Sequence, residues 1–210
     1  MPARRRKSAP SKSSASGDPK QRLIDAAFEL AAEGGWRRLG MAEIAAAAGI
    51  SLHEAYTQFR TKFAILVAFR RGIDEAVLAG PAPSANDSPR DRLFEVLMRR
   101  LEALKPYRRA LRVILRDSVG EPVLGRSLIG FLRSMAWMLA AADLPTGGCQ
   151  GRLTVKLVAA LYASVLPVFF RDESEDLGTT MAALDRRLRQ AESLASALRP
   201  IANRARKARA

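Results

Sequence analysis

The sequence has very few of the residues that hold small proteins together by covalent bonds or by metals. It contains one cysteine and one histidine in 210 residues. A lone Cys149 cannot form an intrachain disulfide, and one cysteine with one histidine cannot supply the ligands of a structural zinc site. His53 has no nucleophile or carboxylate motif beside it. The sequence therefore predicts a protein without metal, without other cofactors and without enzymatic activity.

Long apolar runs and alternating strand patterns are also lacking. The longest apolar stretch, 153–170, contains Lys156 and Pro167 and falls short of the roughly 18 to 20 apolar residues of a membrane-spanning helix. We expect it to be a buried helix. The basic N-terminus is followed by Ala, Ser and Pro, where a signal peptide needs an apolar segment. These features predict a soluble, cytoplasmic protein.

Positive charge is abundant and lies mainly at the two ends of the chain. The net charge is +14, and residues 1–20 and 199–210 each carry +5 of it. Residues 1–18, rich in Arg, Lys, Ser, Ala and Pro, predict a disordered basic arm, and residues 199–210 a basic tail. Such charge suits nucleic acid and an anionic membrane equally well, so both partners stay open at this point.

Helical periodicity accounts for most of the rest. A first helix follows the N-cap candidate Asp18 and stops at Gly34 and Gly35. Further helices are predicted over residues 42–48, 52–59, 62–78, 89–104, 106–118, 122–142, 151–170 and 174–198. The segment 79–89, with three prolines and a glycine, separates a head, 19–79, from a body, 88–198. We predict an all-α fold of about nine helices, with a three-helix helix-turn-helix head and a helical-bundle body.

The second and third helices have the spacing of a helix-turn-helix unit. Alanines 45–48 let the second helix lie close across the third, and Gly49 makes the tight turn between them. Ile50 anchors the turn in the core, and Ser51 caps the third helix so that its first residues face outward.

From Arg22 to Leu66 the chain resembles the DNA-binding head of the tetracycline-repressor family. The matching positions are Arg22, Ile24, Ala26, Ala27, Leu30, Gly35, Ile44, Ala45, Ala48, Gly49, Ile50, Ser51, Tyr56, Phe59, Lys62 and Leu66. The resemblance implies a dimeric, all-α one-component regulator whose first three helices bind operator DNA and whose body binds a small ligand. It also implies that Tyr56 and Lys62 contact DNA phosphates.

Two departures from this family bear on DNA binding. Gly40 and Met41 stand where the family usually has a threonine, and Glu54 brings an acidic group to the third helix. Residues 21–80 are neutral overall, so the basic arm is expected to supply much of the attraction to DNA. The expected DNA-binding residues are Ser51, His53, Glu54, Thr57 and Gln58 at base edges, and Arg37, Arg38, Tyr56 and Lys62 at phosphates.

The body is rich in large apolar side chains, which either fill a core or line a cavity for a small apolar effector. The candidate lining residues are Phe94, Leu97, Met98, Leu101, Ile114, Phe131, Met135, Met138, Leu161 and Tyr162. The last helix carries a nearly heptad apolar seam from Leu177 to Leu198. This seam either packs on its own domain or, with 151–170 and 174–198 of a second copy, forms a homodimer interface.

A second resemblance concerns the body. The runs 101–111 and 171–188 resemble the C-terminal domain of the ubiquinone-biosynthesis lipid-binding family, which shares the tetracycline-repressor fold. That resemblance implies a lipid or isoprenoid cavity and contact with an anionic membrane. We therefore expect a ligand-responsive transcriptional regulator that represses, with a lipid-binding accessory protein that has lost operator binding as the alternative. The operator, the effector and the regulated pathway stay open.

Overall fold

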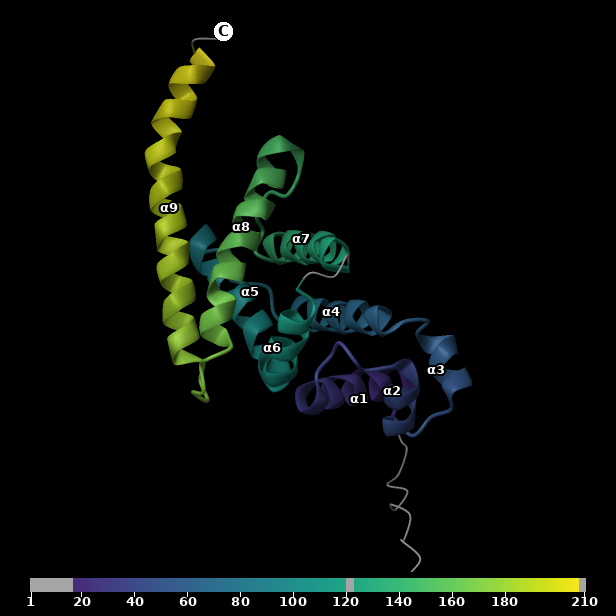
Figure 1. The fold of residues 1–210 in the computed structure, drawn as a ribbon. Helices are drawn as coiled ribbons and strands as arrows, with labels where there is room; N and C mark the ends of the chain where they lie inside the picture. The colour runs from purple at the N-terminus through teal and green to yellow at the C-terminus, as the bar shows by residue number, and fades with distance from the viewer. Residues whose placement is uncertain (1–16, 120–122, 208–210) are drawn as a thin grey trace, which may run out of the picture.

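The computed structural model describes residues 17–119 and 123–207, without the side chains of 123–126 and 194–207. Within these ranges the fold is all-α, as predicted (Figure 1). The elements are α1 (Pro19–Gly34), α2 (Met41–Ala47), α3 (Leu52–Gln58), α4 (Lys62–Leu78), α5 (Pro89–Leu104), the 3-10 turn η1 (Lys105–Tyr107), α6 (Arg108–Asp117), α7 (Val123–Ala141), α8 (Gly148–Phe169) and α9 (Gly178–Lys207). Most of the predicted basic arm lies outside the described residues, as do the side chains of the predicted basic tail.

Helix α1 is the centre of the head. The Asp18 carboxylate accepts a hydrogen bond from the backbone N–H of Lys20 at 3.1 Å, so the predicted N-cap forms. Leu23, Ala27 and Ala31 of the apolar stripe are fully buried. The helix packs on α2, α3 and α4, and its other contact is α6 of the body. Helix α1 therefore lies between the helix-turn-helix unit and the body.

Helix α4 also connects the head to the body. Its inner face, with Ile65, Phe69, Ile73 and Val77 buried, packs on α1 and on α5 and α7. The proline-rich segment that was expected to separate two domains joins α4 to α5, and these two helices contact each other. A movement of α4 would therefore displace contacts in both the head and the body.

Helices α5 to α9 form the body, and α9 lies at the opposite end of the molecule from α3 (Figure 1). Leu97 and Leu101 of α5 and Met135 and Met138 of α7 are completely buried in its core. Helix α9 lies along α8 and also contacts α5. It begins four residues later than predicted and continues through Lys207, so residues 199–207 prolong the helix.

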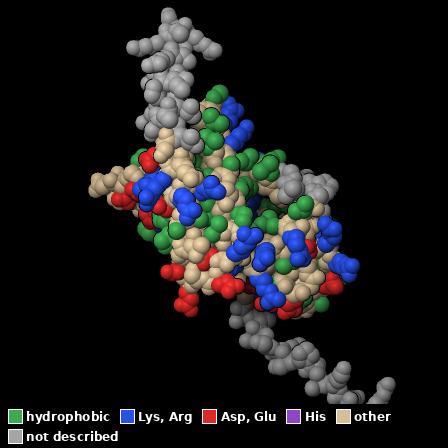
Figure 2. All heavy atoms as spheres, turned by 60° about the vertical axis from the view of Figure 1, so that its left-hand side comes forward, with side chains coloured by type: hydrophobic (Ala, Val, Ile, Leu, Met, Phe, Trp, Pro, Cys, Tyr) green, Lys and Arg blue, Asp and Glu red, His purple; other side chains and the backbone are tan. Residues whose placement is uncertain are grey.

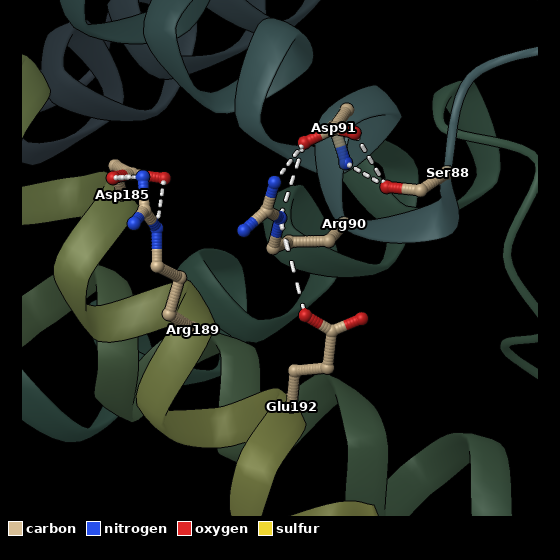
Figure 3. A network of polar contacts seen from close by, with 6 residues as sticks. All are labelled: Ser88, Arg90, Asp91, Asp185, Arg189 and Glu192. Carbon is tan, nitrogen blue, oxygen red and sulfur yellow. Dashed lines mark hydrogen bonds and ion pairs between the residues drawn. The ribbon is translucent and has the colours of Figure 1, made fainter.

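The apolar seam of α9 packs in part within its own chain. Leu177, Leu184 and Leu188 are buried, whereas Met181 is 40 % exposed. Polar contacts add to the α5–α9 junction in Figure 3, where Arg90 of α5 pairs with Asp91 and lies 4.0 Å from Glu192 of α9. Because these groups are partly exposed, the ion pairs stabilise the junction only weakly. The part of the seam up to Leu188 therefore packs mainly inside the body; Leu194 and Leu198 lie outside the described side chains, and a role of the seam in a homodimer stays a prediction.

Helix α8 departs from the expectation of a buried helix. By length and composition alone it could cross a membrane, a test that the core helix of a soluble protein also passes. One of its faces packs on α7 and α9. The other face is open to solvent, with Leu153 57 % and Leu157 61 % exposed. Apolar side chains lie on both faces of the helix, although only one face is covered by its own chain.

Candidate functional site

The turn between α2 and α3 is fixed from outside by α1. Gly49 has the left-handed φ of +66° that the turn requires and that glycine adopts without strain. The Arg22 guanidinium donates hydrogen bonds to the carbonyl oxygens of Ala48 and Gly49, the latter at 3.1 Å. It therefore satisfies carbonyls that are left free where α2 ends. Arg22 matches the family pattern in sequence, but its role as a clamp on the turn appears only in the structure.

Helix α3 begins as the sequence predicts. The Ser51 hydroxyl accepts a hydrogen bond from the backbone N–H of Glu54 at 3.1 Å, and Ala55 is the one buried residue of the helix. Near its end the Thr57 hydroxyl donates to the carbonyl of Glu54 at 2.7 Å. The helix is thus held at its N-terminus and by one small side chain, with its other side chains turned outward.

The predicted base-contacting residues share the outer surface of this helix. Ser51, His53, Thr57 and Gln58 are exposed, and Glu54 is partly exposed. Two large side chains stand among them, Leu52 at 56 % exposure and Tyr56 at 58 %. Exposed apolar and aromatic groups on a short, fixed helix are typical of a contact surface. We call this set, Ser51 to Gln58 without Ala55, the α3 surface.

Arg60 adds a cation that is not among the predicted DNA-binding residues. Its guanidinium carbon lies 5.8 Å from the centre of the Tyr56 ring, and the residue is exposed. Arg60 sits in the short connection between α3 and α4, directly beside the α3 surface. The spacing Tyr56 to Arg60 is an ordinary one-turn pair, so sequence alone did not distinguish it from other surface arginines.

The missing threonine at the start of α2 is replaced by a different cap. The Glu43 carboxylate accepts a hydrogen bond from the backbone N–H of Gly40 at 2.8 Å. This is the half of a capping box that needs no side chain on the N-cap residue. Helix α2 is therefore capped, but Gly40 and Met41 offer no hydroxyl to a phosphate.

The loop before α2, residues 36–39, is held by helix α4 through Lys62. The Lys62 ammonium donates to the carbonyl oxygens of Trp36, Arg37 and Leu39 at 2.9, 3.0 and 3.2 Å. It also lies 5.2 Å from the centre of the Trp36 ring. An ammonium group has three N–H donors, and these contacts use all of them. In this arrangement Lys62 holds the loop and has no donor free for a phosphate.

The same loop is held by helix α6 through Asp117. The Asp117 carboxylate accepts from the backbone N–H of Trp36 at 2.9 Å and of Arg37 at 3.4 Å. The Arg37 guanidinium donates back to the carbonyl of Asp117 at 3.1 Å and, since a guanidinium has five N–H groups, keeps donors for another partner. The hydrogen bond from Trp36 lowers the pKa of Asp117, which keeps it charged. Arg38, the residue after Arg37, is exposed.

A cavity of about 210 Å³ lies where α4 meets the body. Its apolar wall includes Phe63, Leu66 and Val67 of α4, Leu111, Ile114 and Leu115 of α6, Phe131 of α7 and Leu166 of α8. Because an apolar cavity of about 150 Å³ can hold benzene, this one has room for a larger hydrocarbon group. The two helices that hold the loop 36–39, α4 and α6, are therefore also walls of the cavity.

The predicted pocket residues separate into two groups. Ile114, Phe131 and Tyr162 line the cavity. The other seven do not line it: Leu97, Met98, Leu101, Met135 and Met138 are buried in the core, and Phe94 and Leu161 pack against it. The predicted set leaves out the α4 side of the cavity, because the sequence places α4 in the head. Most of the large apolar side chains of the body thus fill its interior.

The polar part of the cavity wall is built around Asp74. Its carboxylate accepts hydrogen bonds from Arg100, from Ser134 at 2.6 Å and from Arg70 at 3.3 Å. Arg70 and Arg100 line the cavity together with Tyr162. Burial raises the pKa of Tyr162 to about 12, against the charge of Arg100, so the phenol keeps its proton at neutral pH. Among the described residues no cluster of His, Cys, Asp and Glu could hold a metal ion.

Comparison with known proteins relates this geometry to a family. Residues 23–69, which include α2, α3 and the first part of α4, match the family model "Bacterial regulatory proteins, tetR family". No sequence among the curated proteins matches the chain.

Solved structures match over most of the chain. A TetR transcriptional regulator from Nitrosomonas europaea ATCC 19718 is 26 % identical, with a TM-score of 0.70 over 84 % of this chain and 99 % of its own. A TetR transcriptional regulator from Rhodococcus sp. RHA1 is 21 % identical, with a TM-score of 0.59 over 82 % of this chain and 94 % of its own. The fatty acid degradation regulator FadR from Bacillus halodurans is 18 % identical, with a TM-score of 0.56 over 83 % and 97 %. The last two likenesses concern the fold alone.

Proposed function

We propose that the chain, a TetR-family transcriptional regulator, binds operator DNA in the cytoplasm as a homodimer and represses transcription until a small ligand enters its cavity. It is not an enzyme. The observation that carries the proposal is the α3 surface, which exposes Leu52 and Tyr56 on a helix whose turn, cap and one buried residue are all fixed.

The α3 surface suits the major groove of DNA. His53, Thr57 and Gln58 offer donors and acceptors for base edges, and Leu52 offers an apolar contact for a thymine methyl group. Glu54 is the unusual member, since an acid near phosphates is favourable only where it accepts a hydrogen bond from a cytosine amino group. The operator half-site is therefore expected to contain a cytosine opposite Glu54.

Phosphate contacts are assigned to the groups around this surface. Tyr56 offers a hydroxyl, Arg60 lies against its ring, and Arg37 and Arg38 stand at the loop before α2. Lys62 takes a different part from the one implied by the family. Its three donors hold the loop that carries Arg37, so it acts by positioning that arginine. The basic residues before α1 add attraction that falls with salt.

The uncovered face of α8 supports the homodimer. Leu153, Leu157, Ala160, Ser164 and Pro167 recur at intervals of four and three residues, and all five are exposed. Trp137 of α7 is also 59 % exposed. Hydrophobic side chains gather over part of the surface in Figure 2. A second copy would cover such a stripe, and two copies would place two α3 surfaces on a palindromic operator.

The response to a ligand is proposed to run through two helices. A molecule in the cavity touches α4 and α6, and these are the helices whose Lys62 and Asp117 hold the loop before α2. Displacing either helix would alter the loop and the position of Arg37. Ligand and operator binding would then oppose each other with a reciprocal coupling free energy.

The experiment that tests operator binding is selection from random duplexes at near-physiological salt, followed by titration of variants. We expect a palindromic motif. A hydrogen bond contributes a net ~1 kcal/mol, so Tyr56→Phe should weaken operator binding about fivefold, and Tyr56→Ala more. Arg60→Ala should reduce both the affinity and its salt dependence, whereas Arg171→Ala, an exposed arginine after α8, should change neither. Recovery of DNA without a motif would overturn the proposal.

The second resemblance is not favoured as a function. It rests on the runs 101–111 and 171–188. The first residues of the second run, 171–177, form the connection between α8 and α9, where Asp172 accepts hydrogen bonds from Ser174 and from Thr180 in the first turn of α9. This pattern of acid and hydroxyl residues has a local reason, which is to cap a helix. Contact with an anionic membrane remains a prediction that no described feature supports specifically.

A further inference from the structure

The cavity wall contains more positive than negative charge. Arg70 and Arg100 both pair with the single carboxylate of Asp74, and among the described residues they form no other ion pair. The side chain of Arg100 is 5 % exposed and that of Asp74 10 %. One carboxylate neutralises one guanidinium, so the group keeps a net charge of +1 in an otherwise apolar wall. The Arg70 side chain is 24 % exposed, so water screens part of this charge, but Arg100 and Asp74 are buried, and a net charge beside them is unfavourable unless a counter-charge joins it.

The same wall contains two polar atoms without partners. Arg100 Nε and the Tyr162 hydroxyl are fully buried and form no hydrogen bond of good geometry in the described structure, although the Arg100 side chain lies close enough to the Tyr162 oxygen to act against the rise of its pKa. Both residues line the cavity, and Tyr162 as a whole is 1 % exposed. Buried polar groups in proteins are nearly always hydrogen-bonded, and leaving one unpaired costs free energy. Both groups are donors, since a guanidinium has no acceptor and the phenol keeps its proton.

We infer that the cavity binds a monoanionic amphiphile, a carboxylic acid with a hydrocarbon group, whose carboxylate accepts hydrogen bonds from Arg100 and Tyr162. A carboxylate supplies one negative charge for the one that is missing, and its two oxygens match two donors. The hydrocarbon group takes the apolar space between α4 and α6, lined by Leu66, Val67, Leu111 and Ile114. A phosphate monoester would bring more negative charge than the wall can balance.

Three features of the wall favour this ligand over a neutral apolar one. A neutral hydrocarbon would leave the surplus positive charge of the Arg70, Arg100 and Asp74 group unbalanced and both donors unpaired. Asp74 carries a single negative charge, and its two oxygens already accept from Arg100, Arg70 and Ser134. The polar residues also lie in the same wall as the apolar ones, as the head and tail of one small molecule require.

This inference rests on the proposal that the cavity takes a ligand, but its test needs no DNA. The full-length protein would be titrated by calorimetry with octanoate, decanoate and dodecanoate and with the primary alcohols of the same chain lengths. At least one acid is expected to bind at least tenfold more tightly than its alcohol. Equal affinity for acid and alcohol, or no binding of any acid, would overturn the inference.

Tyr162→Phe is the informative variant, because it removes only a hydroxyl that has no partner. It should weaken acid binding about tenfold, leave alcohol binding unchanged and leave the thermal stability unchanged or higher. Tyr107→Phe, a tyrosine that does not line this cavity, should alter neither affinity. If Tyr162→Phe bound the acid as tightly as the parent protein, the inference would fail.

Arg100→Met provides the second variant, and it should abolish the preference for the acid. Because Arg100 also pairs with Asp74, its folding would be checked by thermal denaturation before titration. A preference retained by folded Arg100→Met would contradict the inference. A selective acid that binds but leaves operator affinity unchanged would support the inference and overturn the ligand response proposed above, so the two failures can be told apart.

Discussion

The backbone N–H of Trp36 donates a hydrogen bond to the carboxylate of Asp117 across 2.9 Å, and this contact joins the head to the end of α6. Three residues before Asp117, Ile114 lines the cavity. The carbonyl of Trp36 accepts from Lys62 at the start of α4, whose next residue, Phe63, also lines the cavity. The backbone N–H and the backbone carbonyl of Trp36 are thus held by α6 and α4, two helices that a ligand in the cavity would touch.

Asp117→Ala should therefore uncouple the cavity from the operator. The ligand is expected to bind with unchanged affinity, while its effect on operator affinity falls at least fivefold, a large part of a typical coupling free energy. The measurement is operator affinity with and without saturating ligand. Asp117→Asn, which still offers an oxygen to Trp36, should retain part of the coupling.

Asp87→Ala is the matched control, since Asp87 is an exposed aspartate in the segment between α4 and α5. It should leave the coupling intact. Full coupling in Asp117→Ala would show that the contact between Trp36 and Asp117 transmits nothing.

Gly49→Ala should disturb the turn of the helix-turn-helix unit. An alanine at a φ of +66° costs about 1 to 2 kcal/mol, and its Cβ would lie 3.0 Å from the Arg22 guanidinium. We expect unfolding at lower denaturant and an operator affinity reduced at least tenfold. Gly72→Ala is the control: Gly72 lies inside α4 with open space at its Cβ position, so alanine there should stabilise the protein by about 0.5 to 1 kcal/mol.

Gly49 and Arg22 should also show an interaction energy in a double-mutant cycle. In an Arg22→Met background the steric part of the Gly49→Ala penalty is relieved, while the backbone strain remains. The combined effect on unfolding should therefore be smaller than the sum of the two single effects. Strict additivity would mean that Arg22 does not hold the turn.

The sequence predicted features whose causes are local. Ser51 as the cap of α3, Gly49 at the turn and the start of α5 all depend on residues within one helical turn, and the structure has them. Asp117 gave no such signal, because its partner Trp36 is 81 residues away and an aspartate at a helix end is common. A contact between residues so far apart in the sequence follows from how the helices pack, and the spacing of residues along the chain does not predict it.

The cavity was harder to predict than the core. Leu97, Leu101 and Met135 have the same composition and periodicity as residues that line a cavity, yet they are fully buried against neighbours. The position of α4 against the body decides which apolar face lines the cavity. The sequence places α4 in the head and does not predict this position. The unpaired donors of Arg100 and Tyr162 depend on the same position, so only the structure could reveal them.

Leu157→Glu should convert the homodimer into a monomer. Leu157 is 61 % exposed on the uncovered face of α8, so the folded monomer should tolerate the charge, whereas a covered interface would not. Sedimentation equilibrium is expected to give a mass near 22.9 kDa, with unchanged helical content. Leu78→Glu, at a leucine that is 41 % exposed at the end of α4, should remain dimeric. A parent protein that is already monomeric would refute the proposed interface.

The last prediction concerns the junction between α8 and α9 and its dependence on pH. Asp172 is 4 % exposed, and its carboxylate accepts from the backbone N–H of Ser174 at 3.1 Å and of Thr180 at 2.7 Å, and from both hydroxyl groups. Burial tends to raise the pKa of Asp172, but these hydrogen bonds outweigh it and lower the pKa to about 2. The charged form is therefore the one that caps α9.

Because the folded pKa lies below the unfolded value of about 3.9, the stabilisation is complete above that value and is lost as the pH falls towards 2. Its size follows from the shift and is about 2 kcal/mol. Asp172→Asn should lower the free energy of unfolding by about this amount at pH 7, and the difference from the parent protein should shrink between about pH 4 and pH 2. Denaturant titrations at fixed pH values measure it. Asp176→Asn, an exposed aspartate in the same connection, should cost less at pH 7, and a pH-independent gap for Asp172→Asn would show that its charge does not stabilise the junction.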